Sequence, residues 1–462
     1  MKHLFKVDNT ENITFPYANM VNPSICIDKN HNIKILDKKE NFCIKLLGKS
    51  QPSSNPLFSC KSYVSDDNLF VACSFNGDKR GMFKFNIDSL ETPTKIFKKV
   101  LNSEDDLYNY SLQGAIGVDN NNNHLILNLP NISEKTPDTM TANYQCGIIQ
   151  SNYNNNSAWK TYTINTHVEV KGIHNERLCP TSNLYVYDGY TYFVAYDYGI
   201  EGVANNRVVR IAYICRTQDM VTFETKPLLD VTANGGAITS MSDKKLQVSE
   251  PDIVITKNGK AYFVIRLVGN YTVNYSEEHI RNDGYFYGEI ENVNDYFSDI
   301  QNYPQWDFED INEFYGSTVT IKKIICDEIN AFGGGHLKGV LPRIFLNPTT
   351  STPMVVLYAR CNNSYAHNQL YILPDPTNSL LYYKIGKSHN WHGNSNSPEG
   401  GNMSVQVFKN YLSIICPHNR TNEVCCFFIP LQNLYEITDS YDKYSFYATL
   451  EHIEDNSVEV TF

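Results

Sequence analysis

The chain repeats one local pattern, in which two apolar runs are joined by a polar turn rich in Asp, Asn, Gly or Lys. Each copy predicts a β-hairpin, because short apolar runs bounded by turn residues are typical of strands. The copies span Asn22–Leu36, Ser62–Phe75, Gly114–Leu127, Asn183–Tyr196, Ser249–Arg266, Leu341–Arg360 and Met403–Cys416. They start roughly 40 to 90 residues apart, a spacing on the order of the four-stranded blades of a β-propeller. We therefore predict an all-β fold, a β-propeller of six blades, with five or seven blades as alternatives.

The copy at Ser249–Arg266 is the clearest. The run Ile253–Ile255 favours a strand, because β-branched side chains suit a pleated surface. The Asn-Gly pair in the turn tolerates the positive φ that tight hairpins need. Glu250 precedes the first strand and Arg266 follows the second. The hairpin is therefore expected to bring a carboxylate and a guanidinium to one rim of the sheet.

No change of composition marks a second domain, so we expect one propeller domain over residues 1–462. Residues 277–330 are acidic and aromatic and are interpreted as an insertion between blades. Hydrophobic residues make up 42% of the chain and charged residues 19%, which allows a sizeable core. The 32 Tyr and 23 Phe suit strands and also surfaces that stack on sugars. The 12 Cys are scattered and are expected to be reduced, buried thiols.

The net charge of −11 argues against binding of nucleic acid, which needs a basic surface. The sequence has no apolar run of about 18 residues, so no membrane insertion is expected. The N-terminus lacks the apolar segment of a secretory signal, which predicts a cytoplasmic or virion-associated protein. No sequence pattern calls for a metal or other cofactor. A homo-oligomer or assembly into a virion is left open.

The segment Arg177–Glu224 resembles part of the sialidases. Its start is similar to their Arg-Ile-Pro strand, with Arg177, Leu178 and Pro180 in place and Cys179 as an extra residue. Its end, Thr217-Gln-Asp-Met-Val-Thr-Phe, resembles their Asp-box (BNR) turn without its Gly. The same turn, and the hairpin Ser249–Arg266, also resemble five-bladed arabinanase- and xylosidase-type glycosidases. Together the similar segments cover residues 177–360.

The resemblance to sialidases implies a site for a sugar that carries a carboxylate. Arg177, Arg266 and Arg343 would form the cluster that binds the substrate, because guanidinium groups pair with carboxylates bidentately. Glu250 or Asp252 would be the catalytic acid. Sialidases use a Tyr nucleophile in place of a second carboxylate, and Tyr358 is the candidate for it. The implied activity is that of a glycoside hydrolase acting on exposed glycans.

This sequence departs from both families. No acid-base Asp follows Arg177 at the expected place, and Cys179 stands where the five-bladed enzymes have an Asp. A second hypothesis is therefore a non-enzymatic propeller that binds a glycan or a receptor, such as a viral or phage tail component. A third is a scaffold for protein interactions. For each of these charged residues a structural role is the alternative: Glu250 would cap a turn, and Arg266 and Arg343 would be ordinary structural charges. Asp219 is expected to bond the backbone of its own turn.

Overall fold

The computed structural model describes the following parts of the chain: residues 6–7, 13–14, 25–27, 33–35, 42–48, 60–75, 79–86, 94–100, 114–135, 139–149, 159–169, 178–197, 199–200, 207–208, 211–220, 222–230, 247–268, 284–299, 302–306, 314–315, 319–326, 337–361, 369–379, 381–385, 403–418, 423–431, 446–450 and 454–460.

The predicted hairpins are present as antiparallel strand pairs. They are β3 (Ile25–Ile27) with β4 (Ile33–Ile35), β6 (Cys60–Ser65) with β7 (Asn68–Phe75), β10 (Ala115–Val118) with β11 (His124–Lys135), β15 (Tyr185–Tyr187) with β16 (Tyr190–Asp197), β21 (Gln247–Ile255) with β22 (Ala261–Val268), β27 (Leu337–Leu346) with β28 (Pro353–Cys361), and β31 (Ser404–Phe408) with β32 (Tyr411–His418). Every copy of the sequence pattern therefore forms the hairpin that it predicts.

Most of these hairpins are extended on one side by further strands. The added strands are β8 (Lys79–Asn86) and β9 (Thr94–Val100); β12 (Thr139–Ile149) and β13 (Trp159–Glu169); β19 (Ile211–Thr217) and β20 (Thr222–Asp230); β23 (Gly284–Ile290) and β26 (Thr320–Ile325); β29 (Gln369–Leu373) and β30 (Leu381–Ile385); and β33 (Glu423–Pro430) with β5 (Phe42–Gly48). The strand β14 (Leu178–Pro180) also pairs with β16. Each extended hairpin thus becomes an antiparallel sheet of the kind that forms a propeller blade.

The strand β5 comes from the N-terminal part of the chain, yet it pairs with β33 from the C-terminal part. The sheet of β31, β32 and β33 is therefore completed by a strand distant in sequence. Further strands lie parallel to the outer edges: β34 (Phe446–Leu450) on β30, and β35 (Glu454–Val460) on β5. The small separate pairs are β1 (Lys6–Val7) with β2 (Ile13–Thr14) and β17 (Gly199–Ile200) with β18 (Arg207–Val208). The strand β24 (Gln305–Trp306) pairs with β25 (Phe314–Tyr315) and also with β20, which itself pairs in parallel with β13.

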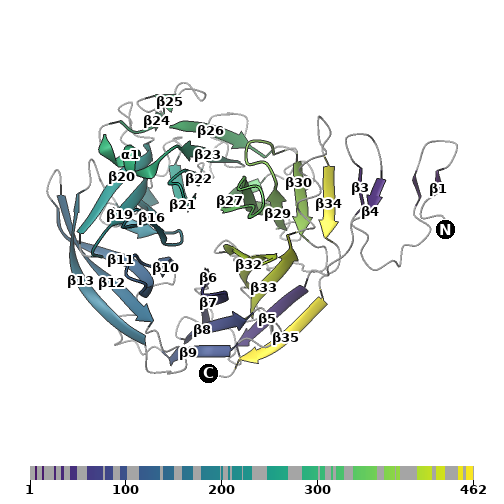
Figure 1. Ribbon diagram of the computed structural model, residues 1–462, viewed down its shortest axis with the longest axis horizontal. Helices are drawn as coiled ribbons and strands as arrows, with labels where there is room; N and C mark the ends of the chain where they lie inside the picture. The colour runs from purple at the N-terminus through teal and green to yellow at the C-terminus, as the bar shows by residue number, and fades with distance from the viewer. Residues whose placement is uncertain are drawn as a thin grey trace.

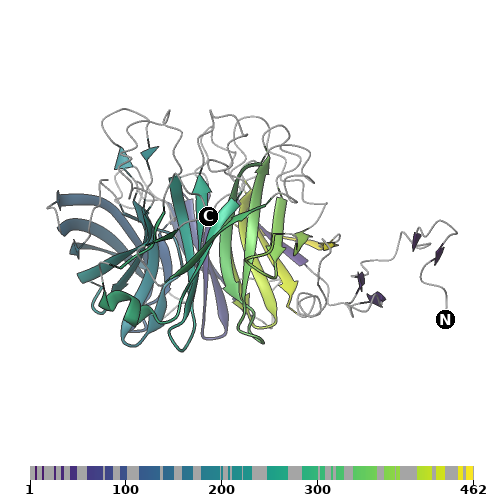
Figure 2. The same cartoon turned by 90° about the horizontal axis from the view of Figure 1, so that it is seen from above.

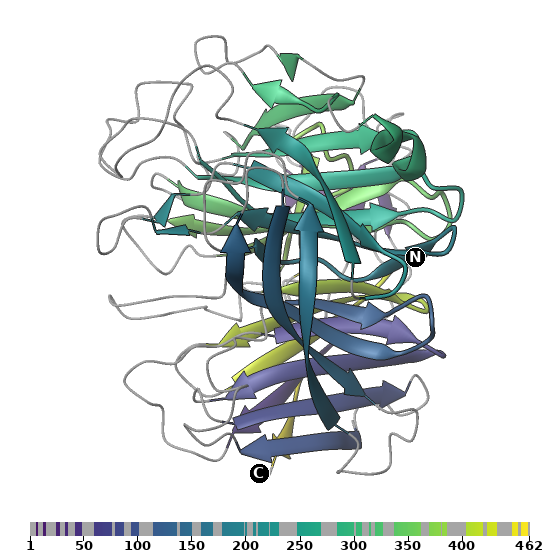
Figure 3. The same ribbon diagram turned by 90° about the vertical axis from the view of Figure 1, so that its left-hand side faces the viewer.

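The sheets are arranged in a ring, with their first strands innermost (Figure 1). Contacts between these first strands run from β6 to β10, then to β15, β21, β27 and β31, and return from β31 to β6. The strands of each sheet run side by side between the two rims of the ring (Figure 2), and the sheets follow one another around it (Figure 3). This arrangement is a β-propeller, as the hairpin pattern predicted. The hairpin of β3 and β4 lies apart from the ring, so the copy at Asn22–Leu36 contributes no blade (Figure 1).

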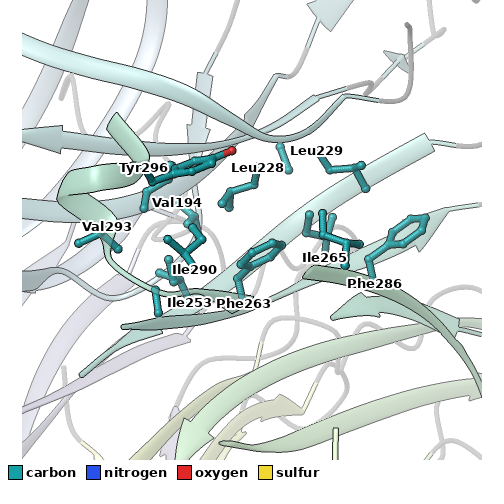
Figure 4. Packing of buried hydrophobic residues seen from close by; sticks show 14 of the residues in the cluster. Val194, Leu228, Leu229, Ile253, Phe263, Ile265, Phe286, Ile290, Val293 and Tyr296 are labelled. Atoms are coloured by element: carbon teal, nitrogen blue, oxygen red, sulfur yellow. The ribbon is translucent and has the colours of Figure 1, made fainter. Parts of the chain in front are cut away.

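Apolar side chains fill the space between neighbouring sheets. One cluster joins β16, β19 and β20 to β21, β22 and β23, with Phe263 and Ile265 fully buried at its centre (Figure 4). The short helix α1 (Val293–Ser298) covers this cluster with Val293 and Tyr296. Other clusters fill the spaces on both sides of β27 and β28. The sheet of β21, β22 and β23 and the sheet of β27, β28 and β29 thus give apolar residues to both faces, and each packs against two neighbours.

Residues 277–330 contain β23 and β26, which hydrogen-bond to the sheet of β22. The insertion between blades at about 277–330 stays a prediction. Among the described cysteines Cys179 is half-buried, and the others are buried: Cys60, Cys215, Cys326, Cys416 and Cys426. This confirms the expected burial for those five residues.

Candidate functional site

Charged side chains gather where the innermost strands of the ring meet. We call Lys61, Glu250, Asp252, Arg266 and Arg343 the central cluster. Lys61 is on β6, the two carboxylates are on β21, Arg266 is on β22 and Arg343 is on β27. Lys61, Asp252 and Arg343 are buried, with 6%, 8% and 5% of their surface exposed. Charged residues are seldom buried in this way unless they are paired or functional.

Glu250 occupies a β-bulge. In the β21–β22 pairing Ser249 lies opposite Arg266 and Asp252 opposite Val264, so two residues of β21 face one residue of β22. Glu250 has φ of 44°, in the left-handed region; among the described non-glycine residues with positive φ it is the one inside a strand. Pro251, which cannot donate to a strand ladder, fits such a bulge. Backbone strain of this kind is enriched at functional sites.

The bulge turns the Glu250 side chain toward Arg266. Arg266 Nη1 donates to Glu250 Oε2, and the two side chains are 13% and 21% exposed. The hairpin pattern predicts that these two groups come together at one rim of the sheet. Their contact confirms that they come together, and it is a charge-assisted hydrogen bond.

Asp252 lies two residues further along β21 and is held from the next sheet. Its Oδ2 accepts the backbone N–H of Ile344 at 3.0 Å. Burial raises the pKa of the Asp252 carboxyl, and the positive charge of Arg343 opposes this shift. Asp252 is therefore a carboxyl group that is kept from water while cations stand nearby, the kind of environment in which acid catalysts are found.

Arg343 is anchored by carbonyl groups. Its Nε donates to the carbonyl of Met403 at 3.1 Å, and its Nη1 to the carbonyls of Glu250 and Pro342, both at 3.3 Å. Within the described residues its Nη2 makes no hydrogen bond, and its guanidinium forms no ion pair with a carboxylate. The guanidinium thus ties β27 to the strands on both sides of it and keeps unused donors.

Lys61 was missed by the sequence analysis. Its Nζ donates to the carbonyl of Thr181, in the segment between β14 and β15. Thr181 in turn donates from Oγ1 to the carbonyl of Pro251 at 2.5 Å. Burial, and next the charge of Arg343, lower the pKa of Lys61 to about 7, although Asp252, Cys60 and Glu250 oppose the shift. The only local signal was a cation at the start of an apolar hairpin strand.

A pair of serines joins the sheets on the other side of Lys61. Ser404 Oγ accepts the backbone N–H of Ser62 and its hydroxyl, both at 2.9 Å. Together with the contacts of Lys61, Thr181 and Arg343, these bonds link β6, β21, β27 and β31. Hydrogen bonds between polar residues therefore connect the inner strands of neighbouring sheets. Apolar clusters fill the spaces between the sheets elsewhere.

The remaining predicted residues lie elsewhere. Arg177 is outside the described residues. Tyr358 is 1% exposed and belongs to the apolar cluster that contains Leu370 and Ile414, so the structure does not place it among the charged groups. Asp219 accepts the N–H of Thr222 at 2.7 Å and the hydroxyl of Thr217 at 3.2 Å. This confirms that Asp219 bonds its own turn.

Among the described residues, no group of three or more His, Cys, Asp or Glu side chains could hold a metal ion. No helix in that part of the chain combines the length and the apolar character required to cross a membrane.

The fold and the central cluster define a β-propeller whose innermost strands carry buried acids and bases. No family model matches the sequence, and no curated protein matches it. Among solved structures, the chain is similar to an α-L-arabinofuranosidase of Fusarium graminearum, with a TM-score of 0.46, 11% identity, and coverage of 85% of this chain and 98% of that one. It is also similar to a sialidase of Trypanosoma rangeli, with a TM-score of 0.44, 11% identity, and coverage of 90% of this chain and 61% of that one. The chain thus spans less than two thirds of that sialidase.

Proposed function

We propose that the chain is a single propeller domain of six blades that acts as a glycoside hydrolase of sialidase-like type on exposed glycans. The observation that supports this most is the placement of two carboxylates, Glu250 and Asp252, on one bulged inner strand, in different environments and beside three cations. Glycosidases need an acid that is protonated and a second group that stabilises positive charge on the sugar. Pairs of titratable groups in unlike environments are a sign of such roles.

Asp252 is the better candidate for the general acid. Its carboxyl is buried, and burial raises its pKa, which favours the protonated form that an acid catalyst requires. Glu250 is bonded to Arg266, which favours its charged form. Glu250 would therefore orient Arg266 and stabilise developing positive charge on the sugar. The general acid and the charged carboxylate would come from the same strand.

Arg266 and Arg343 are the groups that would bind an anionic substituent, with Arg177 as a third. Arg343 supports this role because its Nη2 donors are unused by the described residues while its Nε and one Nη are fixed by carbonyls. A guanidinium fixed in this way needs little reorganisation when a carboxylate arrives.

The test is hydrolysis of a panel of fluorogenic glycosides that includes sialosides and arabinosides. We expect release of one sugar by the wild type, with loss of about 10²- to 10⁴-fold in Asp252→Asn, the size of a general-acid contribution. Glu250→Gln should also be impaired. The control is Glu224→Gln, which breaks an ion pair with Arg216 on β19 and β20, outside the central cluster. An equal loss in that control would mean that the variants report folding alone.

A second candidate function is a glycan-binding propeller without catalysis, such as a viral or phage tail component. The burial of Tyr358 in an apolar cluster favours it, because the assigned nucleophile would then not reach a sugar. Absence of turnover on every glycoside, combined with binding on a glycan array that Arg343→Met abolishes, would select this function.

A further inference from the structure

The central cluster contains more positive charge than its own carboxylates balance. The charge of Glu250 is balanced by Arg266, to which it is bonded. Asp252 is then the one carboxylate of the cluster that can balance the charges of Lys61 and Arg343. Within the described residues, neither Lys61 nor Arg343 forms an ion pair with a carboxylate; their hydrogen bonds go to the backbone carbonyls of Thr181, Met403, Glu250 and Pro342. If all three groups are ionised, Lys61, Arg343 and Asp252 carry one net positive charge.

Both cations also retain donors that the described residues do not use. A lysine ammonium has three N–H donors, and Lys61 uses one, toward Thr181. Arg343 uses Nε and Nη1 and leaves the two donors of Nη2. Arg343 Nη2 is not one of the described buried side-chain atoms that lack a hydrogen-bond partner, so solvent reaches it. A ligand with acceptor oxygens can take the place of that water.

We propose that Lys61 is a ligand-binding residue, and that its ammonium and the guanidinium of Arg343 together hold one carboxylate group of the ligand. This rests on the proposed function, since it names the anionic group that the same site would receive. A carboxylate supplies both one negative charge and acceptor oxygens on two sides. It would bridge the ammonium of β6 and the guanidinium of β27, which stand on different sheets.

The surroundings of Lys61 couple binding to the uptake of a proton. In the free protein its ammonium faces Arg343 on β27, Asp252 and Glu250 on β21, and Cys60 on its own strand. Burial and Arg343 favour the neutral amine, so its pKa falls to about 7. A bound carboxylate favours the ammonium and raises that pKa. Above pH 7, binding must therefore take up a proton, and the affinity must fall as pH rises.

The experiment is isothermal titration calorimetry with acetate and with D-glucuronate at pH 6.5, 7.5 and 8.5, in two amine buffers of different ionisation enthalpy. D-Glucose is the uncharged control ligand. For the wild type we expect affinity to weaken by up to about tenfold per pH unit above pH 7, with uptake of up to about one proton. Lys61→Arg should bind with no such pH dependence, because a guanidinium stays charged throughout this range. Lys61→Met should bind weakly at every pH.

Lys260→Met is the matched control, because Lys260 bonds Glu289 and Glu291 away from the cluster. It should behave like the wild type. The proposal is overturned if neither carboxylate binds, if glucose binds as tightly as glucuronate, if the wild type takes up no proton, or if Lys61→Arg keeps the wild-type pH dependence. These outcomes do not depend on hydrolysis, so a protein that binds carboxylate with proton uptake but cleaves no glycoside would refute the proposed catalysis and support this site.

Discussion

The guanidinium of Arg266 reaches across the β21–β22 hairpin to the carboxylate of Glu250, a residue held inside a strand with φ of 44°. The bulge at Glu250 and Pro251 makes this contact possible, because it adds one residue to β21 and changes the direction of the Glu250 side chain. The pair therefore combines a strained backbone with a partly buried ion pair.

A double-mutant cycle tests the value of that pair. We expect Glu250→Gln and Arg266→Met to show a coupling free energy of about 1–3 kcal/mol in urea unfolding, because removal of one partner leaves a partly buried charge. The control cycle uses Lys260→Met and Glu291→Gln, an ion pair in which Glu291 is 84% exposed. That pair should couple by less than about 1 kcal/mol. Equal coupling free energies in both cycles would show that the Glu250–Arg266 pair is no stronger than an exposed ion pair.

Lys61 should make stability depend on pH. The unfolded lysine keeps its proton to higher pH than the folded one, whose pKa is about 7. The free energy of unfolding should therefore rise as pH increases above 7, by up to about 1.4 kcal/mol per pH unit. Lys61→Met should lack this rise, whereas Lys260→Met should keep it. Urea unfolding at pH 7.0, 8.0 and 9.0 measures it, and parallel curves for wild type and Lys61→Met would contradict it.

His124 should also make the free energy of unfolding depend on pH, in a range below that of Lys61. It is 5% exposed and bonds Tyr63 Oη through Nδ1 at 2.9 Å. Burial lowers the pKa of His124, against the charges of Asp66 and Asp119. The unfolded histidine thus takes up a proton first, and stability should be lost as pH falls below 6.5, by up to about 1.4 kcal/mol per unit. His124→Phe should flatten this dependence. Tyr63→Phe, which keeps the imidazole, should retain it with a constant loss of about 1 kcal/mol.

Two glycines of positive φ allow the cost of backbone strain to be measured apart from the cost of a steric clash. Gly259 ends the β21–β22 turn with φ of 84°, and a Cβ there would lie 2.5 Å from the ring of Tyr187. Gly189 has φ of 76°, but a Cβ there would meet nothing within 4 Å. Gly189→Ala should cost about 1–2 kcal/mol from backbone strain alone. Gly259→Ala should cost more in urea unfolding, and Tyr187→Ala in the same chain should reduce that extra cost.

The general acid should show itself in the pH profile of activity. Because burial raises the pKa of Asp252, the protonated acid persists to a higher pH than an exposed aspartate allows. kcat/KM should fall as pH rises through that pKa, and Asp252→Asn should lose this basic limb together with about 10²- to 10⁴-fold in rate. A basic limb that survives in Asp252→Asn would assign the acid to another residue.

Much of the architecture follows from local sequence. Each apolar run and its turn, such as Lys257–Lys260, forms a hairpin from interactions between near neighbours. The Glu250–Arg266 contact was predictable for the same reason, since both residues belong to one hairpin. The helix α1 was not predicted, although Asn292 caps it through the N–H groups of Asn294 and Asp295. It is only six residues long, too short for a helical period to show in the sequence.

Short-range alternation and turn chemistry encode the hairpins, the all-β class and the carboxylate–arginine pair of one hairpin. Long-range packing of the chain settles the other features: which hairpins share the ring, the addition of β5 to the last sheet, the burial of Tyr358 in an apolar cluster, and the meeting of Lys61, Asp252 and Arg343 at the centre. Those relations join residues up to 386 positions apart (Phe42 to Phe428). Nothing in a strand's own pattern states which other strands it will face, so such contacts are fixed only when the sheets pack around a common axis.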